Sequence, residues 1–294
     1  MSAPLSASLS LSSRLRRLGG SARRRFTREA LEAIARVGYG ARGFVYLSAG
    51  ALTLLATLDR TDGAAGAREA LVWLAQQPFG RAWLLLAGGG LLAFVIWRAL
   101  QAVFDADHEG RSWRGLSTRM SQGFSGLGYA LLAASAFHML VRPPSGDGAG
   151  LAAGRDGAER LLSLPLGNWL LVGVGLSIAG VGVANVVRAW RGDFSEYLAC
   201  SEALCRRVSL LARAGYVARG LAWLPLAALV VAAGLNSRAA DVTSFGAALD
   251  VVERQPGGAG FLIPAALGFM AFGAFSFVEA RFRRIRAPAE VLPG

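Results

Sequence analysis

One unit recurs three times along this chain, and the repeat constrains the fold more than any other feature. Each unit opens on a basic, glycine-rich stretch that leads into an apolar segment, crosses a polar loop that ends at a proline, and closes with a second apolar segment. The three openings share an arginine, a glycine seven residues later and a tyrosine or tryptophan ten residues later. Self-similarity at a fixed period indicates duplicated structural units. The sequence therefore predicts three copies, over about residues 35–110, 118–194 and 212–286.

The turn before the second apolar segment repeats as well. A proline is followed two residues later by a glycine at the equivalent position of every unit, as Pro78 and Gly80, Pro165 and Gly167, and Pro256 and Gly258. The stretches before the first and third of these prolines, 67–77 and 245–255, have the apolar spacing of a short amphipathic helix. Proline ends a helix at the residue before it, so each short helix should stop at this turn.

Each unit contains two apolar runs of about the length that crosses a hydrocarbon core, which takes roughly 20 residues. The six runs are 37–58, 82–104, 122–141, 167–187, 214–235 and 260–278. The mean hydropathy of +0.43 and the 54% hydrophobic content agree with this assignment. We expect an all-α membrane protein with six transmembrane helices, arranged as three parallel two-helix repeats that pack as a pseudo-threefold bundle.

The net charge of +12 is mainly a signal of membrane topology and gives no reason to expect a nucleic-acid partner. All 31 basic residues are arginines, and 21 of them lie before the first apolar run, in alternate loops or after the last run. Basic residues concentrate on the cytoplasmic side of membrane proteins. Both termini should therefore be cytoplasmic.

Residues 1–30 are rich in serine and arginine and lack the apolar core of a secretory signal. We expect a disordered cytoplasmic arm here, able to lie on anionic lipid, with a mitochondrial transit peptide as the alternative. Residues 31–286 should form the membrane domain, and 287–294 a tail.

Two motifs resemble a bacterial membrane family called domain of unknown function 1206. One is Ala-Arg-x-Gly-Tyr-x-Ala-Arg-Gly at 35–43 and 212–220, and the other is Gln-Pro-Phe-Gly-Arg at 77–81, with Trp97-Arg98 ending the second apolar run. The resemblance covers about residues 31–286 and implies three tandem two-helix repeats in a bacterial inner (plasma) membrane, with no established activity. The middle unit departs from the motif, because Gln122 and Ser125 replace the tyrosine and the second arginine.

Arg42 and Arg219 are the first candidate functional residues, because ionisable side chains inside a membrane span are costly. Both lie close to the cytoplasmic end of their spans, so each can reach lipid phosphate or bond to Tyr39 or Tyr216 on a neighbouring helix. The alternatives are an anionic lipid or ligand site and a conduction path. Gly43, Gly126 and Gly220 should let helices approach closely.

Other polar residues carry weaker signals. The position 23 residues after each proline is Gln101, Arg188 or Glu279, which predicts solvated helix ends or, alternatively, a polar ring around the pseudo-axis. Cys200 and Cys205 fall in a predicted cytoplasmic loop, where thiols stay reduced. His108 stands beside Asp105, Asp107 and Glu109, where we expect a solvated acidic turn, with transient metal binding as the alternative. His138 has no carboxylate neighbour on another span. We expect no metal and no cofactor.

The sequence shows no catalytic triad, no carboxylate pair within a span and no metalloprotease motif, so we expect no enzymatic activity. The leading hypothesis is a structural or accessory membrane component that contacts lipid and a protein partner or a second copy of itself. The alternatives are a small channel or uncoupled transporter along the pseudo-threefold axis, an anionic-lipid-binding protein, and an enzyme acting on lipid.

Overall fold

A computed structural model describes residues 5–58, 66–142, 149–192, 194 and 196–285, with side chains from residue 28 onward except 149–154. These ranges are helical apart from turns and one isolated β-bridge between Leu198 and Arg283. The helices are α1 Leu5–Thr57, α2 Ala67–Gln76, α3 Gly80–Phe104, α4 Trp113–Val141, α5 Ala149–Leu162, α6 Gly167–Arg191, α7 Glu202–Leu235, the short 3₁₀ helix Ala239–Asp241, α8 Phe245–Glu253 and α9 Gly258–Phe282.

Five of these helices are long and apolar enough to cross a membrane, namely α3, α4, α6, α7 and α9. They coincide with the last five of the six predicted spans. The C-terminal half of α1 covers the first predicted span, but α1 is not among the five. The structure thus supports a multi-pass membrane protein, and the sixth span stays a prediction.

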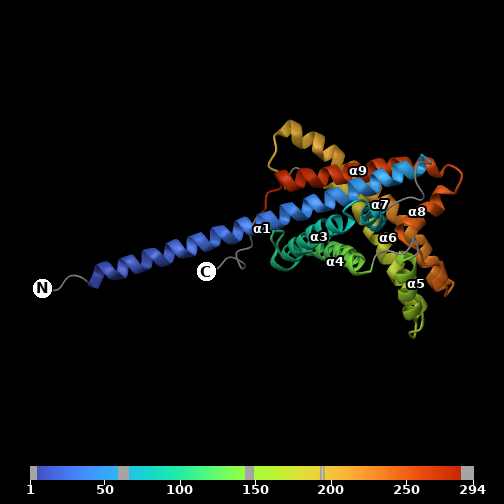
Figure 1. Cartoon of the computed structure of the whole chain (residues 1–294), viewed down its shortest axis with the longest axis horizontal. Helices are drawn as coiled ribbons and strands as arrows, with labels where there is room; N and C mark the ends of the chain where they lie inside the picture. The colour runs from blue at the N-terminus through green and yellow to red at the C-terminus, as the bar shows by residue number, and fades with distance from the viewer. Residues whose placement is uncertain (1–4, 59–65, 143–148, 193, 195, 286–294) are drawn as a thin grey trace.

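The first helix differs from the prediction for the chain's beginning. We expected a disordered arm over residues 1–30, whereas α1 begins at Leu5 and runs without a break to Thr57. Figure 1 shows α1 extending well beyond the other helices. No proline or glycine pair interrupts 21–57, and alanine, leucine and arginine are strong helix formers, which favours continuation of the membrane-side helix into this segment. The predicted tail, 287–294, lies outside the described residues.

Short helices precede each repeated turn, as predicted for α2 and α8, and α5 occupies the same place in the middle unit. The residue after each repeated proline has a positive φ, at 62° for Phe79, 61° for Leu166 and 84° for Gly257. The glycine that follows has no room for a side chain. A Cβ at Gly80 would lie 2.1 Å from the carbonyl oxygen of Ala75, and the equivalent glycines of the other units are equally confined. This contact explains why the turn repeats as proline, any residue, glycine.

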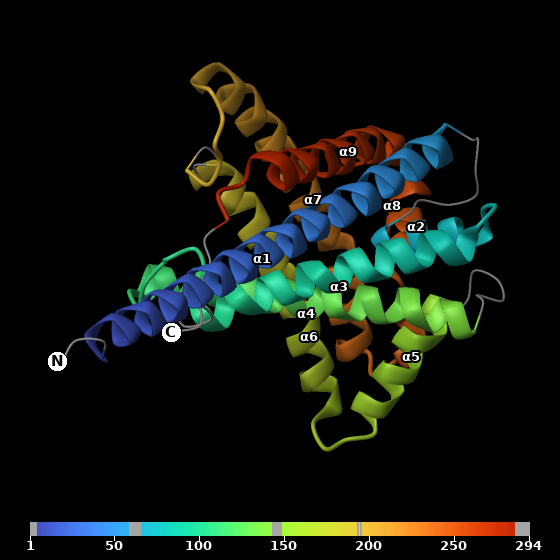
Figure 2. The ribbon, with the colours of Figure 1, turned by 60° about the vertical axis from the view of Figure 1, so that its left-hand side comes forward.

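The long helices pack in the order α4, α3, α1, α9, α7 and α6. Figure 2 shows α3, α1 and α9 running side by side. The first and last units of the sequence therefore meet along α1 and α9. A Cβ at Gly43 of α1 would lie 2.9 Å from the carbonyl oxygen of Gly273 on α9, and one at Gly220 of α7 would lie 2.6 Å from that of Gly182 on α6. A Cβ at Gly126 of α4 would lie 3.1 Å from the Cβ of Arg98 on α3.

Candidate functional site

Six buried aromatic rings fill the centre of the helix bundle. Tyr39, Phe94 and Tyr129 form one edge-to-face series, with centroids 5.1 and 4.8 Å apart. Tyr46, Phe272 and Tyr216 form a second, with centroids 4.8 and 5.1 Å apart. These rings come from α1, α3, α4, α7 and α9, so five helices meet where the two series lie. Edge-to-face pairs of this kind each add about 0.5–1.5 kcal/mol beyond the burial of their surface.

Arg42 lies between the two series and is 1% exposed. Its guanidinium carbon is 4.9 Å from the ring centroids of Tyr39, Phe94 and Phe272. Its Nε donates to Ser276 Oγ at 3.0 Å, and one terminal nitrogen donates to Glu279 in an ion pair. Because Arg42 is enclosed by protein and paired with a carboxylate, it does not extend to lipid phosphate, which was one of the expectations from the sequence.

The ion pair continues toward the arginine-rich end of the bundle. Arg283 donates to Glu279 Oε1 at 2.7 Å and to Asp107 Oδ2 at 2.8 Å. Gln101 donates to the same Asp107 oxygen at 2.6 Å. The side chains of Asp107, Glu279 and Arg283 are each 4–6% exposed. A single network thus joins α1 and α9 to the end of α3 and the loop that follows it.

Two backbone hydrogen bonds close this end of the network, and we call the paired segments the seal. Ala199 donates to the carbonyl of Phe282 and Arg284 donates to that of Tyr197, so the segment before α7 lies along the segment after α9. The Tyr197 hydroxyl donates to Glu109 at 2.7 Å. Burial and this bond to a carboxylate raise the pKa of Tyr197 above its usual value.

Arg219 occupies the position equivalent to Arg42 in the third unit, but it has a different environment. Its guanidinium carbon lies 5.2, 5.9 and 4.9 Å from the rings of Tyr46, Tyr129 and Phe272. The side chain is half-buried, and its buried Nε has no hydrogen-bond partner in the part of the chain that the structure describes. Within the described ranges, no carboxylate lies at ion-pair distance from it. Arg219 therefore keeps a positive charge that the surrounding protein does not neutralise.

Two more arginines lie against the same rings without a carboxylate partner among the described residues. Arg98 is 6% exposed, stacks on Phe94 at 4.9 Å and donates only to Gln101, at 3.0 Å. Arg188 is half-buried and stacks on Tyr216 at 5.3 Å. We call Arg42, Arg98, Arg188, Arg219 and Arg283, with Glu279 and Asp107, the arginine cluster. Its five guanidinium groups face two carboxylates, which leaves an excess of three positive charges.

Unpartnered polar atoms mark the side of the cluster that faces α4. Among the described residues, the buried atoms that find no hydrogen-bond partner include Arg98 Nε, Gln122 Oε1, Tyr129 Oη and Arg219 Nε. They come from α3, α4 and α7. Leaving such groups unpaired costs about 1–3 kcal/mol each, and more for charged groups. An anion bound beside α4 would satisfy several of them together.

The structure brings together the four polar residues singled out from the sequence. Tyr39 and Tyr216 are buried beside Arg42 and Arg188, and Tyr39 accepts a hydrogen bond from Trp97 Nε1 at 3.3 Å. The expectation of solvated helix ends is wrong for Gln101 and Glu279, which are 0% and 4% exposed. Both join the cluster network, because α9 continues past the predicted span end at 278 and packs on α1, and the turn after α3 brings Asp107 to Gln101.

Asp107 is the main residue that sequence reasoning missed. It was placed in a solvated acidic turn with His108, Asp105 and Glu109. Asp105 caps that turn by accepting from the backbone N–H groups of Glu109 and Gly110, both at 2.8 Å, and the turn directs Asp107 inward. A carboxylate that follows Ala106 and precedes His108, with Asp105 and Glu109 two residues away on either side, gives no sequence signal that separates a buried network residue from a surface loop.

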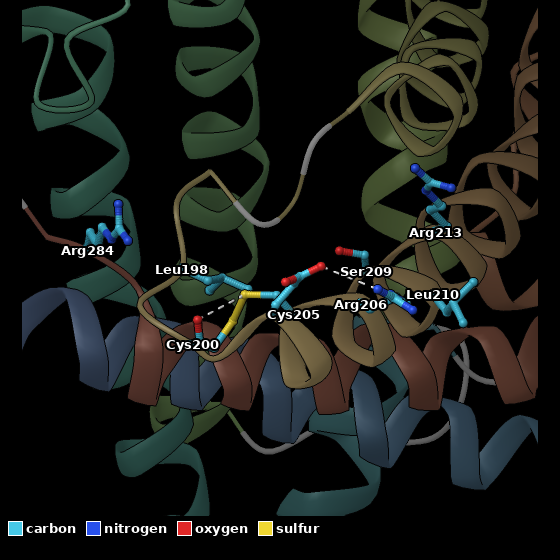
Figure 3. Close-up of a pocket in the computed structure, with 9 residues that line it drawn as sticks. Leu198, Cys200, Cys205, Arg206, Ser209, Leu210, Arg213 and Arg284 are labelled. Atoms are coloured by element: carbon cyan, nitrogen blue, oxygen red, sulfur yellow. Dashed lines mark hydrogen bonds and ion pairs between the residues drawn. A yellow bond between two sulfur atoms is a disulfide. The ribbon is translucent and has the colours of Figure 1, made fainter.

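Cys200 and Cys205 also differ from the expectation. Two separate reduced thiols were predicted, but the structure joins them in a disulfide, with Cα atoms 5.7 Å apart. The chain turns into α7 between them, which brings the two Cβ atoms within bonding range of a disulfide. Figure 3 shows the disulfide on a pocket of about 630 Å³ at the arginine-rich end.

Comparison with known proteins agrees with the repeats seen in the sequence and the fold. The family described as Domain of Unknown Function (DUF1206) matches three times, over residues 37–105, 121–192 and 214–283. The chain belongs to this family. A relative from Bacillus subtilis (strain 168), named "Uncharacterized protein YxxB", is 27% identical over 266 residues, which covers 88% of this chain and 94% of the relative. No solved structure matches.

Proposed function

We propose that this DUF1206 protein is a non-catalytic accessory component of the bacterial inner membrane that holds an anionic phospholipid headgroup at the arginine cluster. The observation that carries the proposal is the excess of three guanidinium groups over carboxylates in a bundle with five described helices long and apolar enough to cross a membrane. Unpaired charge in such surroundings is costly, and a bound anion removes that cost.

The location of the unpartnered atoms favours a phospholipid over a small soluble anion. α4 and α6 are the least buried of the five apolar helices, with 28% and 17% of their most apolar window inside the protein, and each packs extensively on one long helix only. Arg188 and Arg219 on α6 and α7 are both half-buried, so they remain accessible from outside the bundle. A phosphate group there accepts from guanidinium groups, and a headgroup hydroxyl can donate to Gln122 Oε1.

The six-span, pseudo-threefold arrangement belongs to the same proposal. Three close glycine contacts pair the first helix of each unit with the second helix of the preceding unit, where the third unit counts as the one before the first; they are made by Gly43, Gly126 and Gly220. This cyclic pattern supports a threefold bundle whose first span is the C-terminal half of α1. The arginine-rich loops support cytoplasmic termini. The packed aromatic rings at the centre favour a contact role over conduction along the axis.

Native mass spectrometry of the protein purified in mild detergent tests the lipid proposal. We expect retained phosphatidylglycerol to exceed its fraction in the host membrane, and Arg219→Leu or Arg188→Leu to reduce that excess. Arg191→Leu is the matched control, because Arg191 lies on the same helix as Arg188 but is exposed. Retained lipid that mirrors the membrane composition in every variant would refute the proposal. Affinity purification of the tagged protein from its own host tests the accessory role by identifying protein partners.

A further inference from the structure

The disulfide pocket at the start of α7 is separate from the arginine cluster and has chemistry of its own. The pocket has a volume of about 630 Å³, and its lining includes Cys200, Glu202, Cys205, Arg206, Arg213 and Arg284. Figure 3 shows the sulfur–sulfur bond between the arginine side chains. Three guanidinium groups face one carboxylate, which gives the pocket an excess of two positive charges. Arg206 pairs with Glu202 only weakly, at 3.4 Å, since both side chains are largely exposed.

The two sulfurs differ in access. Cys200 is partly exposed, whereas Cys205 is 9% exposed and lies in the first turns of α7. The N-terminal N–H groups of a helix carry partial positive charge and stabilise negative charge nearby. A nucleophile from solvent therefore reaches Cys200 Sγ more easily, and Cys205 Sγ is the better placed to leave with negative charge.

We propose that Cys200 and Cys205 form a reversible thiol–disulfide exchange site for an anionic low-molecular-weight thiol that the arginine-lined pocket attracts. The thiolate of the small thiol attacks Cys200 Sγ, the bond between the two protein sulfurs breaks, and its electron pair leaves on Cys205 Sγ. A second thiolate then attacks the small-molecule sulfur of the mixed disulfide. The small thiol leaves as its own disulfide, Cys200 leaves as a thiolate, and two protons convert the protein sulfurs to thiols.

The position of the site matches this role. The disulfide lies at the arginine-rich end, which is the predicted cytoplasmic side, where thiol pools reduce disulfides. Cys200 directly follows Ala199, whose N–H donates to the carbonyl of Phe282 at the end of α9. Opening the disulfide therefore removes a covalent constraint next to the backbone hydrogen bonds that close the end of the arginine cluster.

The test compares three small thiols of similar size and different charge on the full-length protein in detergent. They are 2-mercaptoethanesulfonate, 2-mercaptoethanol and cysteamine, which are anionic, neutral and cationic. Reduction is followed by alkylation and intact mass, and each rate is divided by that thiol's rate with a neutral reference disulfide at the same pH. We expect the normalised rate of the anion to exceed that of the cation by about 10-fold at low salt. In about 1 M salt the ratio should approach one.

Replacing the pocket arginines with glutamine, as Arg206→Gln, Arg213→Gln and Arg284→Gln together, should also bring the ratio toward one. Arg207→Gln is the control, because Arg207 is exposed on the same helix but does not line the pocket. Thermal unfolding verifies that each variant is folded. Cys205→Ser treated with the disulfide of 2-mercaptoethanesulfonate should hold a mixed disulfide on Cys200. Equal normalised rates for the three thiols, or an anion preference that survives in the triple variant, would overturn the proposal.

Discussion

Replacement of Glu279 with methionine should destabilise this protein strongly, because it leaves a buried cation without its carboxylate. Arg42 is 1% exposed and, of its side-chain hydrogen-bond partners among the described residues, would retain Ser276 alone, 3.0 Å from its Nε. Arg283 would still have Asp107 at 2.8 Å. Removal of one member of a buried ion pair costs about 3–5 kcal/mol. We expect Glu279→Met to fall in this range.

The reverse replacement should cost less, because Glu279 has a second partner. In Arg42→Met, Glu279 still accepts from Arg283 at 2.7 Å, so the expected cost is about 1.5–3 kcal/mol, the value of one hydrogen bond to a charged group. The double variant contains neither charge and a methionine fills each position. It should be no less stable than Glu279→Met alone, although two sites have changed. Such strong non-additivity is the signature of direct coupling between the two side chains.

The measurement is reversible unfolding of the purified protein in detergent micelles, followed by helical signal, for the wild type, both single variants and the double variant. Glu32→Met is the control. The side chains of Glu32 and Arg36, which form an ion pair at 2.5 Å, are each about one-third exposed, so the pair should contribute about 1 kcal/mol at most. A cost below about 1 kcal/mol for Glu279→Met, or a double variant whose cost equals the sum of the single variants, would refute the reasoning.

Three further predictions follow from the packing and from the seal of the network. Gly80→Ala should cost about 1–3 kcal/mol in the same unfolding assay, because the new Cβ would lie 2.1 Å from the Ala75 carbonyl oxygen; a stable Gly80→Ala variant would contradict the turn geometry. Gly43→Val should destabilise more than Gly40→Val, since a Cβ at Gly43 meets α9 and one at Gly40 meets nothing within 4 Å; equal effects would exclude the α1–α9 contact. Tyr197→Phe should cost about 1.5–3 kcal/mol at neutral pH. Folding raises the pKa of Tyr197 above 10.0, the value of an unfolded tyrosine. Stability should therefore fall as the pH rises beyond 10.0, because the unfolded chain then releases this proton more readily than the folded chain. The phenylalanine variant should lack this part of the fall in stability.

The repeats made most of the helices predictable, because apolar length and a recurring proline are local features. The spans at 82–104, 122–141, 167–187, 214–235 and 260–278 each coincide with one long helix, and 67–77 and 245–255 coincide with α2 and α8. The beginning of α1 could not be predicted in the same way. Serine and arginine fit a disordered arm as well as a helix, and no apolar period within 1–30 decides between them.

The candidate site was predictable only in part. The alignment of the units singled out Arg42 and Arg219, because a charge inside an apolar run is visible in one segment. The partner of Arg42 was not visible, because Glu279 lies 237 residues away, and their contact depends on the packing of α1 against α9. The two equivalent arginines look alike in sequence, but among the described residues only Arg42 has such a carboxylate partner. Such ion-pair partners depend on which helices pack side by side, and the sequence of a single unit does not show this.

The middle unit has Ser125 in place of the second arginine, and the excess of positive charge at the centre of the bundle gives a physical reason for this difference. Arg42 and Arg219 both contact the central group of rings and share Phe272, and Tyr129, one turn after Ser125, supplies one of the rings that Arg219 contacts. A third arginine at Ser125 would raise the excess of guanidinium groups over carboxylates from three to four, with Glu279 and Asp107 already engaged. Burial of another unpaired cation costs several kcal/mol. A small serine avoids that cost and leaves the α4 side of the cluster less crowded, and the unpartnered atoms of Gln122 and Tyr129 lie on this same helix.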